Sequence, residues 1–432
     1  MDIVLYHLKR LIPRSLLRAI QPPYHYILAL CGAILYHFPS KEITIIGVTG
    51  TKGKSSVVEI LNAIFEADGK RTAVSGTIRF KIGEKSERNL YKMTMPGRFF
   101  VQKFLRDAVN AGCEIAILEM TSEGVTQYRH KFIHLDALVF TNLSPEHIES
   151  HGSYEKYIAA KLELARGLEY SQKRPRFMVA NRDDDHGKVF LEASVEYPLP
   201  YGVSDLELYN LNKDDLSLVI EGSTIRVPLI GLFNVYNCLA AITTARAFGV
   251  PRKTIHTALE NLTPIKGRVE LFKSPKGASK KLTVVVDYAH TPDSLEKLYT
   301  AFEKEVKVAI LGNTGGGRDT WKRPEMGRIA GHHCVRVILT NEDPYDEDPK
   351  KIIDEMARGV EDESKVSIIM DRRKAIRTAI EEAPSGSVVL ITGKGTDPYI
   401  MGPHNTKTPW SDAKVVEQEL AAIFGTISEN VS

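Results

Sequence analysis

A glycine-rich loop placed between a strand and a helix is the feature that most constrains this fold. Ile43–Val48 is a short run rich in β-branched residues, and Ser55–Ala67 carries apolar residues at helical spacing. The segment between them reads Gly47-Val-Thr-Gly-Thr-Lys-Gly-Lys54-Ser55. A strand, a glycine-rich loop and a helix in this order are typical of a phosphate-binding P-loop. The loop is one residue longer between its outer glycines than the strict GxxxxGK[ST] pattern.

The residue types of this loop suit a nucleoside triphosphate. Backbone N–H groups of the turn and of the helix N-terminus can hold phosphate oxygens. Lys54 can neutralise phosphate charge, and the Ser55 hydroxyl can bind Mg²⁺. We therefore predict ATP and Mg²⁺ as cofactors, with nucleotide contacts from Gly50, Thr51, Lys52, Gly53, Lys54, Ser55 and Ser56. The alternative interpretation is a glycine-rich turn that binds no ligand.

A second metal ligand is predicted at Glu119. It follows the apolar run Ile115–Leu118, and the carboxyl end of a buried strand is where open α/β sheets bind ligands. Histidines 130, 134, 147 and 151 cluster in the sequence without an HExxH motif, so zinc is not indicated. The acidic runs 183–185 and 343–348 lack the ligand spacing of an EF-hand.

The order of apolar runs predicts an α/β fold with two main domains. Strand-length runs at Ala137–Phe140 and Phe177–Ala180 alternate with helices, which indicates a mostly parallel sheet. Leu206–Pro228 alternates polar and apolar residues and predicts a small antiparallel sheet. A second α/β series follows Gly267. We predict a P-loop central domain over 42–265 and a Rossmann-like C-terminal domain over 266–432.

Composition narrows the class of protein. The net charge of +3 in 432 residues gives no reason to expect nucleic-acid binding. The four cysteines are scattered and form no CxxC pair, which argues against a zinc site or a disulfide framework. This usage fits the cytoplasm.

The N-terminal segment 1–41 is apolar and helical in pattern. Tyr24–Phe38 follows four basic residues, is shorter than the roughly 20 residues that span a bilayer, and precedes no signal cleavage site. We expect a helix packed on the next domain. The alternative is peripheral contact of residues 1–40 with the inner membrane face.

Several motifs in chain order resemble the Mur ligase family, in particular its tripeptide-forming branch. The loop Thr49–Ser55 resembles TGTNGKT, and the stretch from Glu119 to Gly124 resembles EVSSHG. Further matches run along the chain: Phe140–His147 (FTNLSRDH), His151 to Lys161 (HG…YxxAK), Phe233–Asn237 (FNxxN), Gly267–Glu270 (GRME), Asp287–Asp293 (DYAHTPD), Gly315–Asp319 with Lys322–Pro324 (GGDRD…KRP), and Gly393–Gly395 (GKG).

This resemblance implies roles for individual residues. It implies catalytic roles for Lys54, Lys161 and His147, with Lys161 carbamylated, and Mg²⁺ ligation by Ser55, Glu119, His147 and Lys161. It implies nucleotide contacts from Asn234, Asn237, Arg268, Asp287 and His290. It implies substrate contacts from Thr94, Met95, Thr121, Ser122, Gln127, Arg129, Arg318, Asp343, Tyr345, Gly393 and Asp397.

The implied activity is ATP-dependent amide-bond formation in peptidoglycan precursor synthesis, with an amino acid and a muramyl-peptide acceptor as substrates. Two departures stand out. About 45 residues precede the P-loop in this chain. The family has about 90 residues there, which form a domain that binds the uridine nucleotide. Tyr345 replaces the arginine of the DNPR motif that reads diaminopimelate. The acceptor therefore stays open between nucleotide-linked and lipid-linked forms, and a neutral or basic amino acid is expected.

Three alternatives differ in class. A folylpolyglutamate-type ligase would share fold and chemistry, but the DYAHTPD and KRP motifs argue against it. A P-loop motor or switch would leave Lys161, Asn234 and Asn237 unexplained. A non-catalytic scaffold at the membrane would not need intact phosphate and metal residues.

Overall fold

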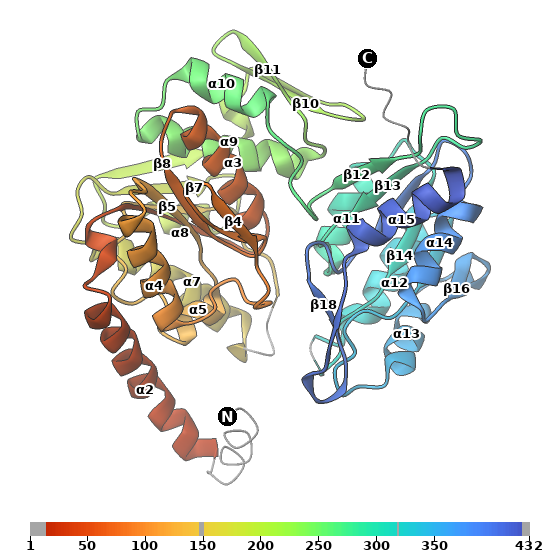
Figure 1. The fold of residues 1–432 in the computed structure, drawn as a ribbon, viewed down its shortest axis with the longest axis horizontal. Helices are drawn as coiled ribbons and strands as arrows, with labels where there is room; N and C mark the ends of the chain where they lie inside the picture. The colour runs from red at the N-terminus through yellow and green to blue at the C-terminus, as the bar shows by residue number, and fades with distance from the viewer. Residues whose placement is uncertain (1–13, 147–150, 318, 426–432) are drawn as a thin grey trace. The chain divides into compact units, whose positions relative to one another are not determined.

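The computed structural model describes residues 14–146, 151–317 and 319–425 of the chain. Its described residues form two compact units (Figure 1). The first draws on the segments Met1–Leu143, Glu155–Val203 and Cys238–Ile255. The second draws on Ser144–Tyr154, Ser204–Asn237 and His256–Ser432. The linear boundaries predicted at 41/42 and 265/266 stay a prediction.

The first unit is built on an eight-stranded sheet with the P-loop strand near its middle. The strand order is β4-β3-β2-β5-β1-β6-β7-β8, and all neighbours from β2 to β8 pair in parallel. Only β3 and β4 add antiparallel pairs at one edge. The bounds are β1 Thr44–Thr49, β2 Thr72–Ser75, β3 Arg79–Ile82, β4 Lys85–Arg88, β5 Ile115–Glu119, β6 Ala137–Phe140, β7 Phe177–Asn181 and β8 Tyr197–Tyr201.

Helices connect these strands. The helix after the P-loop, α3, contacts β1, β2 and β5. At the N-terminal end, α2 packs along α4, as Figure 1 shows. The bounds are α2 Arg14–Leu35, η1 Pro39–Lys41, α3 Lys54–Ala67, α4 Arg98–Asn110, α5 Ser122–Thr126, α7 Tyr154–Glu169 and α8 Gly187–Leu191. Three later helices contain residues of both units: η2 Val203–Asp205, α9 Leu232–Ala247 and α10 Arg252–Glu260.

The second unit holds a three-stranded antiparallel sheet and a six-stranded sheet. The small sheet has the order β11-β10-β9, and the larger one β12-β13-β17-β14-β15-β16. All neighbours in the larger sheet pair in parallel except β12 with β13. The bounds are β9 Leu208–Leu211, β10 Leu216–Ile220, β11 Ser223–Val227, β12 Glu270–Lys273, β13 Thr283–Val286, β14 Lys307–Leu311, β15 Arg336–Leu339, β16 Val366–Ile368 and β17 Val388–Ile391.

The remaining elements of the second unit are helices and a two-stranded ribbon. The ribbon pairs β18 with β19 in antiparallel fashion. The bounds are α11 Pro292–Thr300, α12 Lys322–His333, α13 Pro349–Ala357, η3 Glu363–Lys365, α14 Arg372–Glu382, β18 Tyr399–Met401, η4 Pro403–Asn405, β19 Lys407–Pro409 and α15 Asp412–Phe424.

Strands of the larger sheet are apolar on both faces. Along β14, Ala309 and Leu311 belong to one buried cluster, whereas Val308 and Ile310 belong to another. Successive strand residues point to opposite faces, so both faces are covered. This explains why the sequence shows continuous apolar runs here, as parallel sheets require.

The predicted fold class is confirmed. The strands predicted near the P-loop are present as β1, β5, β6 and β7. The small antiparallel sheet predicted over Leu206–Pro228 is present as β9 to β11. The expected N-terminal helix packed on the next domain is also present, as α2 against α4. Among the described residues, no helix has both the length and the apolar character needed to cross a bilayer.

Candidate active site

The P-loop joins β1 to α3 through a backbone that requires glycine. Gly50 has a φ of 143° and Gly53 a φ of 83°, a region that L side chains rarely adopt. A Cβ at Gly50 would lie 1.9 Å from the Thr141 Oγ1. The loop is therefore pressed against the end of β6, and substitution of Gly50 would displace it.

The P-loop places the positively charged Lys54 at the N-terminus of α3, which no side chain caps. Lys54 begins α3, and its Nζ donates to the Gly50 and Thr51 carbonyl oxygens at 3.0 Å each. No side chain caps the α3 N-terminus at Gly53. Helix N-terminal amides beside a lysine favour a bound phosphate. The predicted residues Gly50 to Ser56 thus lie together in a form that fits a nucleotide phosphate.

Two residues outside the loop hold its shape. The Asn142 Oδ1 accepts from the Lys52 amide at 3.0 Å, and the Thr141 Oγ1 donates to the Lys52 carbonyl at 2.6 Å. Sequence reasoning assigned neither residue a role. Their place in the Phe140–His147 motif, directly after β6, was the available signal.

Glu119 connects the P-loop to the segment after β2. Its carboxylate accepts from the Ser55 hydroxyl, with both oxygens 3.1 Å away, and from the Thr77 amide at 2.8 Å. Thr77 also bonds to the Thr94 hydroxyl at 2.8 Å. A buried carboxylate next to a P-loop hydroxyl is an oxygen donor set that fits Mg²⁺. Thr77 is a further site residue that the sequence analysis missed.

Lys161 lies on α7 and reaches the same loop. It is buried, its Nζ donates to the Gly50 carbonyl at 2.8 Å, and it lies 4.9 Å from the centre of the Tyr157 ring. The Tyr157 hydroxyl is 2.9 Å from the Thr51 Oγ1. The YxxAK spacing thus puts both side chains, one turn apart on α7, against the P-loop.

The segment 121–132 contains four of the predicted substrate-contact residues, namely Thr121, Ser122, Gln127 and Arg129. Thr121 caps α5 by accepting from the Gly124 amide at 3.1 Å, and Ser122 is buried beside it. Arg129 donates to the Met95 carbonyl and to the Gln127 Oε1, the latter at 2.7 Å. Burial and, next, the charge of nearby Arg98 lower the pKa of Arg129. Two guanidinium groups close together favour an anionic ligand here.

In the second unit, the five residues outside the P-loop that are predicted to contact the nucleotide form two small groups. The Asn237 amide donates to the Asn234 Oδ1 at 2.8 Å, and both side chains are buried near the start of α9. The Asp287 carboxylate accepts from the Val269 and Ala289 amides. Arg268 stacks on Tyr288 at 4.6 Å, and His290 bonds to the Tyr288 carbonyl at 2.7 Å.

Two of the predicted substrate-contact residues, Asp343 and Asp397, lie beside the buried Lys394. The Lys394 Nζ lies 2.8 Å from the Asp343 Oδ1 and 3.4 Å from the Asp397 Oδ2, and it donates to the Tyr399 carbonyl at 2.6 Å. Gly393 has a φ of 98°, and a Cβ there would lie 2.0 Å from the Glu342 Oε2. Burial, followed by the Asp343 charge, raises the pKa of Glu342. Lys394 is therefore fully engaged by this acidic cluster.

The environments of Tyr345 and Arg323 affect which amino acid substrate can be expected to bind. The Tyr345 backbone has a φ of 53° and its amide donates to the Met401 carbonyl at 3.2 Å. Arg323 is fully buried, and its Nη1 pairs with Glu347 and Glu355 at 2.7 Å each. Arg323 is thus committed to an internal ion-pair network and does not replace the missing arginine.

Two predicted residues, His147 and Arg318, lie outside the described residues. Within residues 14–146, 151–317 and 319–425, no group of three or more His, Cys, Asp or Glu side chains forms a metal-binding cluster. The fit to Mg²⁺ therefore rests on Ser55, Glu119 and the neighbouring Lys161.

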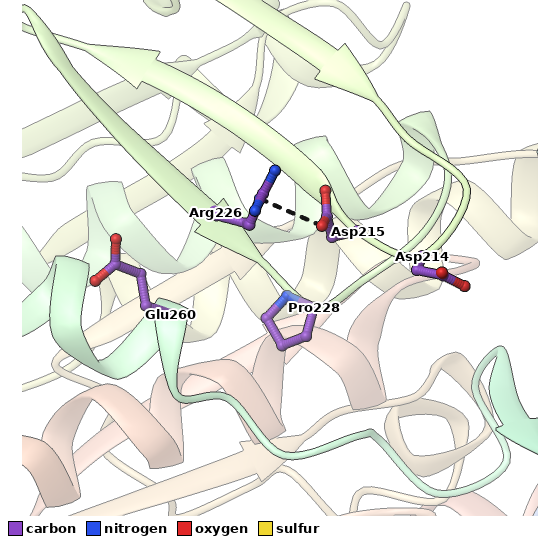
Figure 2. Close-up of a pocket in the computed structure, with 5 residues that line it drawn as sticks. All are labelled: Asp214, Asp215, Arg226, Pro228 and Glu260. Carbon is purple, nitrogen blue, oxygen red and sulfur yellow. Dashed lines mark ion pairs between the residues drawn. The ribbon is translucent and has the colours of Figure 1, made fainter.

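A shallow pocket of about 310 Å³ opens elsewhere in the second unit. Figure 2 shows Arg226 and Asp215 pointing toward one another within it, with an ion-pair distance of 3.3 Å. Asp214, Pro228 and Glu260 complete its lining. None of the predicted site residues lines this pocket.

Comparison with protein families gives two matches. The profile described as the Mur ligase middle domain matches residues 48–245. The profile described as the Mur ligase, glutamate ligase domain matches residues 267–395. The first range contains the P-loop, Glu119, Lys161 and the segment 121–132, and the second contains Arg268, Asp287, Asp343 and Lys394.

Individual relatives agree with this. The UDP-N-acetylmuramyl-tripeptide synthetase of Roseiflexus sp. (strain RS-1) is 37% identical over 423 residues, spanning 92% of this chain and 82% of the relative. The UDP-N-acetylmuramoyl-L-alanyl-D-glutamate–2,6-diaminopimelate ligase of Listeria monocytogenes serotype 4b (strain F2365) is 33% identical, spanning 86% of this chain and 77% of the relative.

Solved structures match over a similar range. A structure of a UDP-N-acetylmuramoyl-L-alanyl-D-glutamate–2,6-diaminopimelate ligase aligns with a TM-score of 0.58 and 29% identity, covering 88% of this chain and 78% of that one. A folylpolyglutamate synthase of Mycobacterium tuberculosis aligns with a TM-score of 0.67 at 17% identity, covering 86% of this chain and 93% of that one. The second likeness is one of fold alone.

Proposed function

Because the chain belongs to the Mur ligase family, whose members are ATP-dependent acid–amino-acid ligases, we propose that it joins an amino acid to a muramyl-dipeptide-like acceptor. The observation that best supports this proposal is the hydrogen-bond network that joins Ser55, Glu119, Thr77 and Thr94. It links the phosphate loop to the segment that the family resemblance assigns to the acceptor. The substrates are small molecules, and the product is a peptidoglycan precursor.

The reaction runs in two steps. The acceptor carboxylate attacks the γ-phosphorus of ATP, the bond to the β–γ bridging oxygen breaks, and ADP leaves an acyl phosphate behind. The amine of the amino acid then attacks the acyl carbon, inorganic phosphate departs, and the amine loses a proton. Phosphoryl transfer of this kind depends mainly on positioning and charge neutralisation.

Each residue near the P-loop has a task in this scheme. Lys54 and the α3 N-terminus hold the ATP phosphates. Ser55 and Glu119 would hold Mg²⁺, together with His147 and a carbamylated Lys161, and the ion would neutralise phosphate charge. Asn234, Asn237, Arg268, Asp287 and His290 are proposed to contact the rest of the nucleotide.

The two organic substrates use different parts of the chain. The segment 121–132, called the acceptor loop from here on, would contact the acceptor with Thr94 and Met95, and Arg129 suits an anionic group. The amino acid would contact Asp343, Tyr345, Gly393 and Asp397, with Arg318 added. This acidic surrounding favours a neutral or basic side chain, lysine being the first to test. We also propose a cytoplasmic location with peripheral membrane contact through residues 1–40.

An ADP-release screen of the purified protein tests the function. It crosses a panel of amino acids with UDP-linked and lipid-linked muramyl dipeptides, and adds a folate substrate as the arm for the folylpolyglutamate-type alternative. ADP release that depends on both a muramyl dipeptide and an amino acid is expected. Release with neither present would assign the chain to the P-loop NTPases, and release with folate alone would replace the proposed acceptor.

Lys54→Ala should reduce that release to background, because it removes the charge at the transferring phosphate. Lys70→Ala is the matched control, since Lys70 forms an exposed ion pair with Glu114. Activity of Lys54→Ala within a few-fold of the Lys70→Ala control would contradict the assignment.

A further inference from the structure

The outer face of α2 is apolar although it is exposed. Tyr24, Ile27, Cys31 and Ile34 recur at intervals of three and four residues, which places them on one face of the helix. Their exposure is 54% for Tyr24, 57% for Ile27 and 55% for Ile34, and Cys31 is also exposed. Leu35 extends this face with 59%. These five residues are called the α2 patch below.

The opposite face of α2 is already occupied by its own unit. Ala29 and Ala33 are buried, and a Cβ at Gly32 would lie 3.6 Å from the Phe99 backbone on α4. Small residues on this side let α2 pack closely on α4. The helix therefore has an inner face that packs and an outer face that is apolar, with no Lys, Arg, Asp or Glu between Arg18 and Lys41.

The charge distribution of the chain identifies what covers the patch. Residues 1–41 hold five Lys or Arg and one Asp, a net charge of +4, whereas the whole chain carries +3. The remaining 391 residues therefore carry −1. The excess positive charge of this protein is thus confined, in the sequence, to the segment that contains the α2 patch, and basic segments with an apolar face are typical of helices that lie on anionic lipid. A second copy would bring like charges together.

The α2 helix also touches the acceptor loop. The Tyr26 ring packs against the Tyr128 and Phe132 rings, with centroids 6.0 and 5.3 Å away. His25 contacts Arg98, whose Nε donates to the Gln127 carbonyl at 2.9 Å. Whatever surface the α2 patch binds is thus close to the acceptor loop.

We propose that the α2 patch binds an anionic lipid bilayer and holds the acceptor loop beside the lipid headgroups. The apolar side chains enter the boundary between headgroups and acyl chains, and the net positive charge of segment 1–41 attracts it to anionic headgroups. The bilayer contact specifies the membrane contact proposed above for residues 1–40, and only the task of the acceptor loop rests on the proposed ligase activity. The contact itself does not require that activity, so either can fail without the other.

Vesicle flotation of the full chain tests the contact. Vesicles of equal parts phosphatidylglycerol and phosphatidylcholine should carry the protein upward, whereas pure phosphatidylcholine should carry at least about tenfold less, since basic segments bind anionic lipid. The double variant Ile27→Glu, Ile34→Glu should lose binding by a similar factor. Leu208→Glu is the control, because Leu208 on β9 is 54% exposed outside the patch. Equal binding by the double variant and the control would overturn the proposal.

Cys31 supplies a probe that leaves the sequence unchanged. It is the exposed cysteine, while Cys113, Cys238 and Cys334 are buried. An environment-sensitive fluorophore on Cys31 should shift to the blue when the anionic vesicles are added. An unshifted spectrum would place the patch in water and overturn the proposal even if the double variant failed to fold. Vesicle-free dimerisation that the double variant abolishes would overturn it in favour of a second copy.

Discussion

The Ser55 hydroxyl lies 3.1 Å from both carboxylate oxygens of Glu119, although 63 residues separate them in the sequence. The register of β1 beside β5 creates this contact, because Val48 pairs with Glu119. Both side chains then lie at the carboxyl edge of the parallel sheet, where open α/β sheets bind their ligands.

Glu119→Gln should therefore lower kcat by at least about 100-fold, since a bound metal stabilises transition-state charge by several kcal/mol. The amide keeps the size of the side chain but weakens Mg²⁺ binding, so the Mg²⁺ concentration for half-maximal rate should rise. Kinetics at several Mg²⁺ concentrations measure both effects. Glu192→Gln, at an exposed glutamate on the same unit, should behave as wild type. An unchanged Mg²⁺ dependence in Glu119→Gln would remove Glu119 from the metal site.

Lys161→Ala should be nearly inactive and should recover partly with added short carboxylates. The buried Lys161 amine lies beside the P-loop, and a carbamate on it would supply a carboxylate ligand. A small carboxylate can fill the space and the charge that alanine leaves. Lys156→Ala is the matched control, as this lysine is exposed on the same helix. Failure of every carboxylate to raise the rate, with the fold intact, would argue for a plain structural lysine.

Most of the fold and the core of the site were predictable because their signals are local. The P-loop is one continuous segment, and the apolar runs reveal a sheet covered on both faces. Thr77 was not predictable, since an ordinary Gly76-Thr77 turn acquires its role only by meeting Glu119 across the sheet. The network of Arg323 with Glu347 and Glu355 likewise joins α12 to later segments, and no spacing rule reports such pairs.

His130 should make the protein sensitive to acid. Burial, followed by the Lys131 charge, lowers the pKa of His130 from 6.5 to about 4. Above pH 6.5 neither the folded nor the unfolded state binds this proton, so stability is unaffected. As the pH falls from 6.5 to about 4, only the unfolded histidine is protonated. The folded state should therefore lose on the order of 3 kcal/mol.

Unfolding experiments between about pH 7.5 and about pH 4.5 measure this slope. His130→Gln cannot ionise and should flatten the pH dependence, whereas His404→Gln, at an exposed histidine of the second unit, should not. Identical slopes for wild type and His130→Gln would assign the acid sensitivity to other groups.

The second unit contains a buried ion pair whose two halves should be strongly coupled. Arg372 and Asp412 are both buried, with Nη2 and Oδ2 2.7 Å apart, and the Trp410 indole donates to Asp412 at 2.8 Å. Asp412→Ala should destabilise this unit by about 3–5 kcal/mol, because it leaves a buried charge unpaired. Adding Arg372→Met should restore part of that loss. Additive losses in thermal unfolding would show that the pair is not coupled.

Tyr345 stands where the resemblance to Mur ligases implies an arginine for a distal carboxylate, and Arg323 is engaged by Glu347 and Glu355. Lys394 is engaged by Asp343 and Asp397. A second carboxylate entering this acidic cluster would have no free cationic partner among these three residues, and an unpaired buried charge costs several kcal/mol. The wild type should thus favour lysine over diaminopimelate in kcat/KM.

Tyr345→Arg should reverse or narrow that preference by about tenfold or more, since a charge-assisted bond contributes about 1.5–3 kcal/mol. The change should appear mainly in the KM for diaminopimelate, while the KM for ATP stays constant because the substituted side chain lies outside the P-loop. Tyr345→Phe is the control, as it keeps the ring and adds no charge. A wild type that already prefers diaminopimelate would show that another cation fills the place of the missing arginine. A Tyr345→Arg variant no better than Tyr345→Phe would show that position 345 does not contact the incoming side chain.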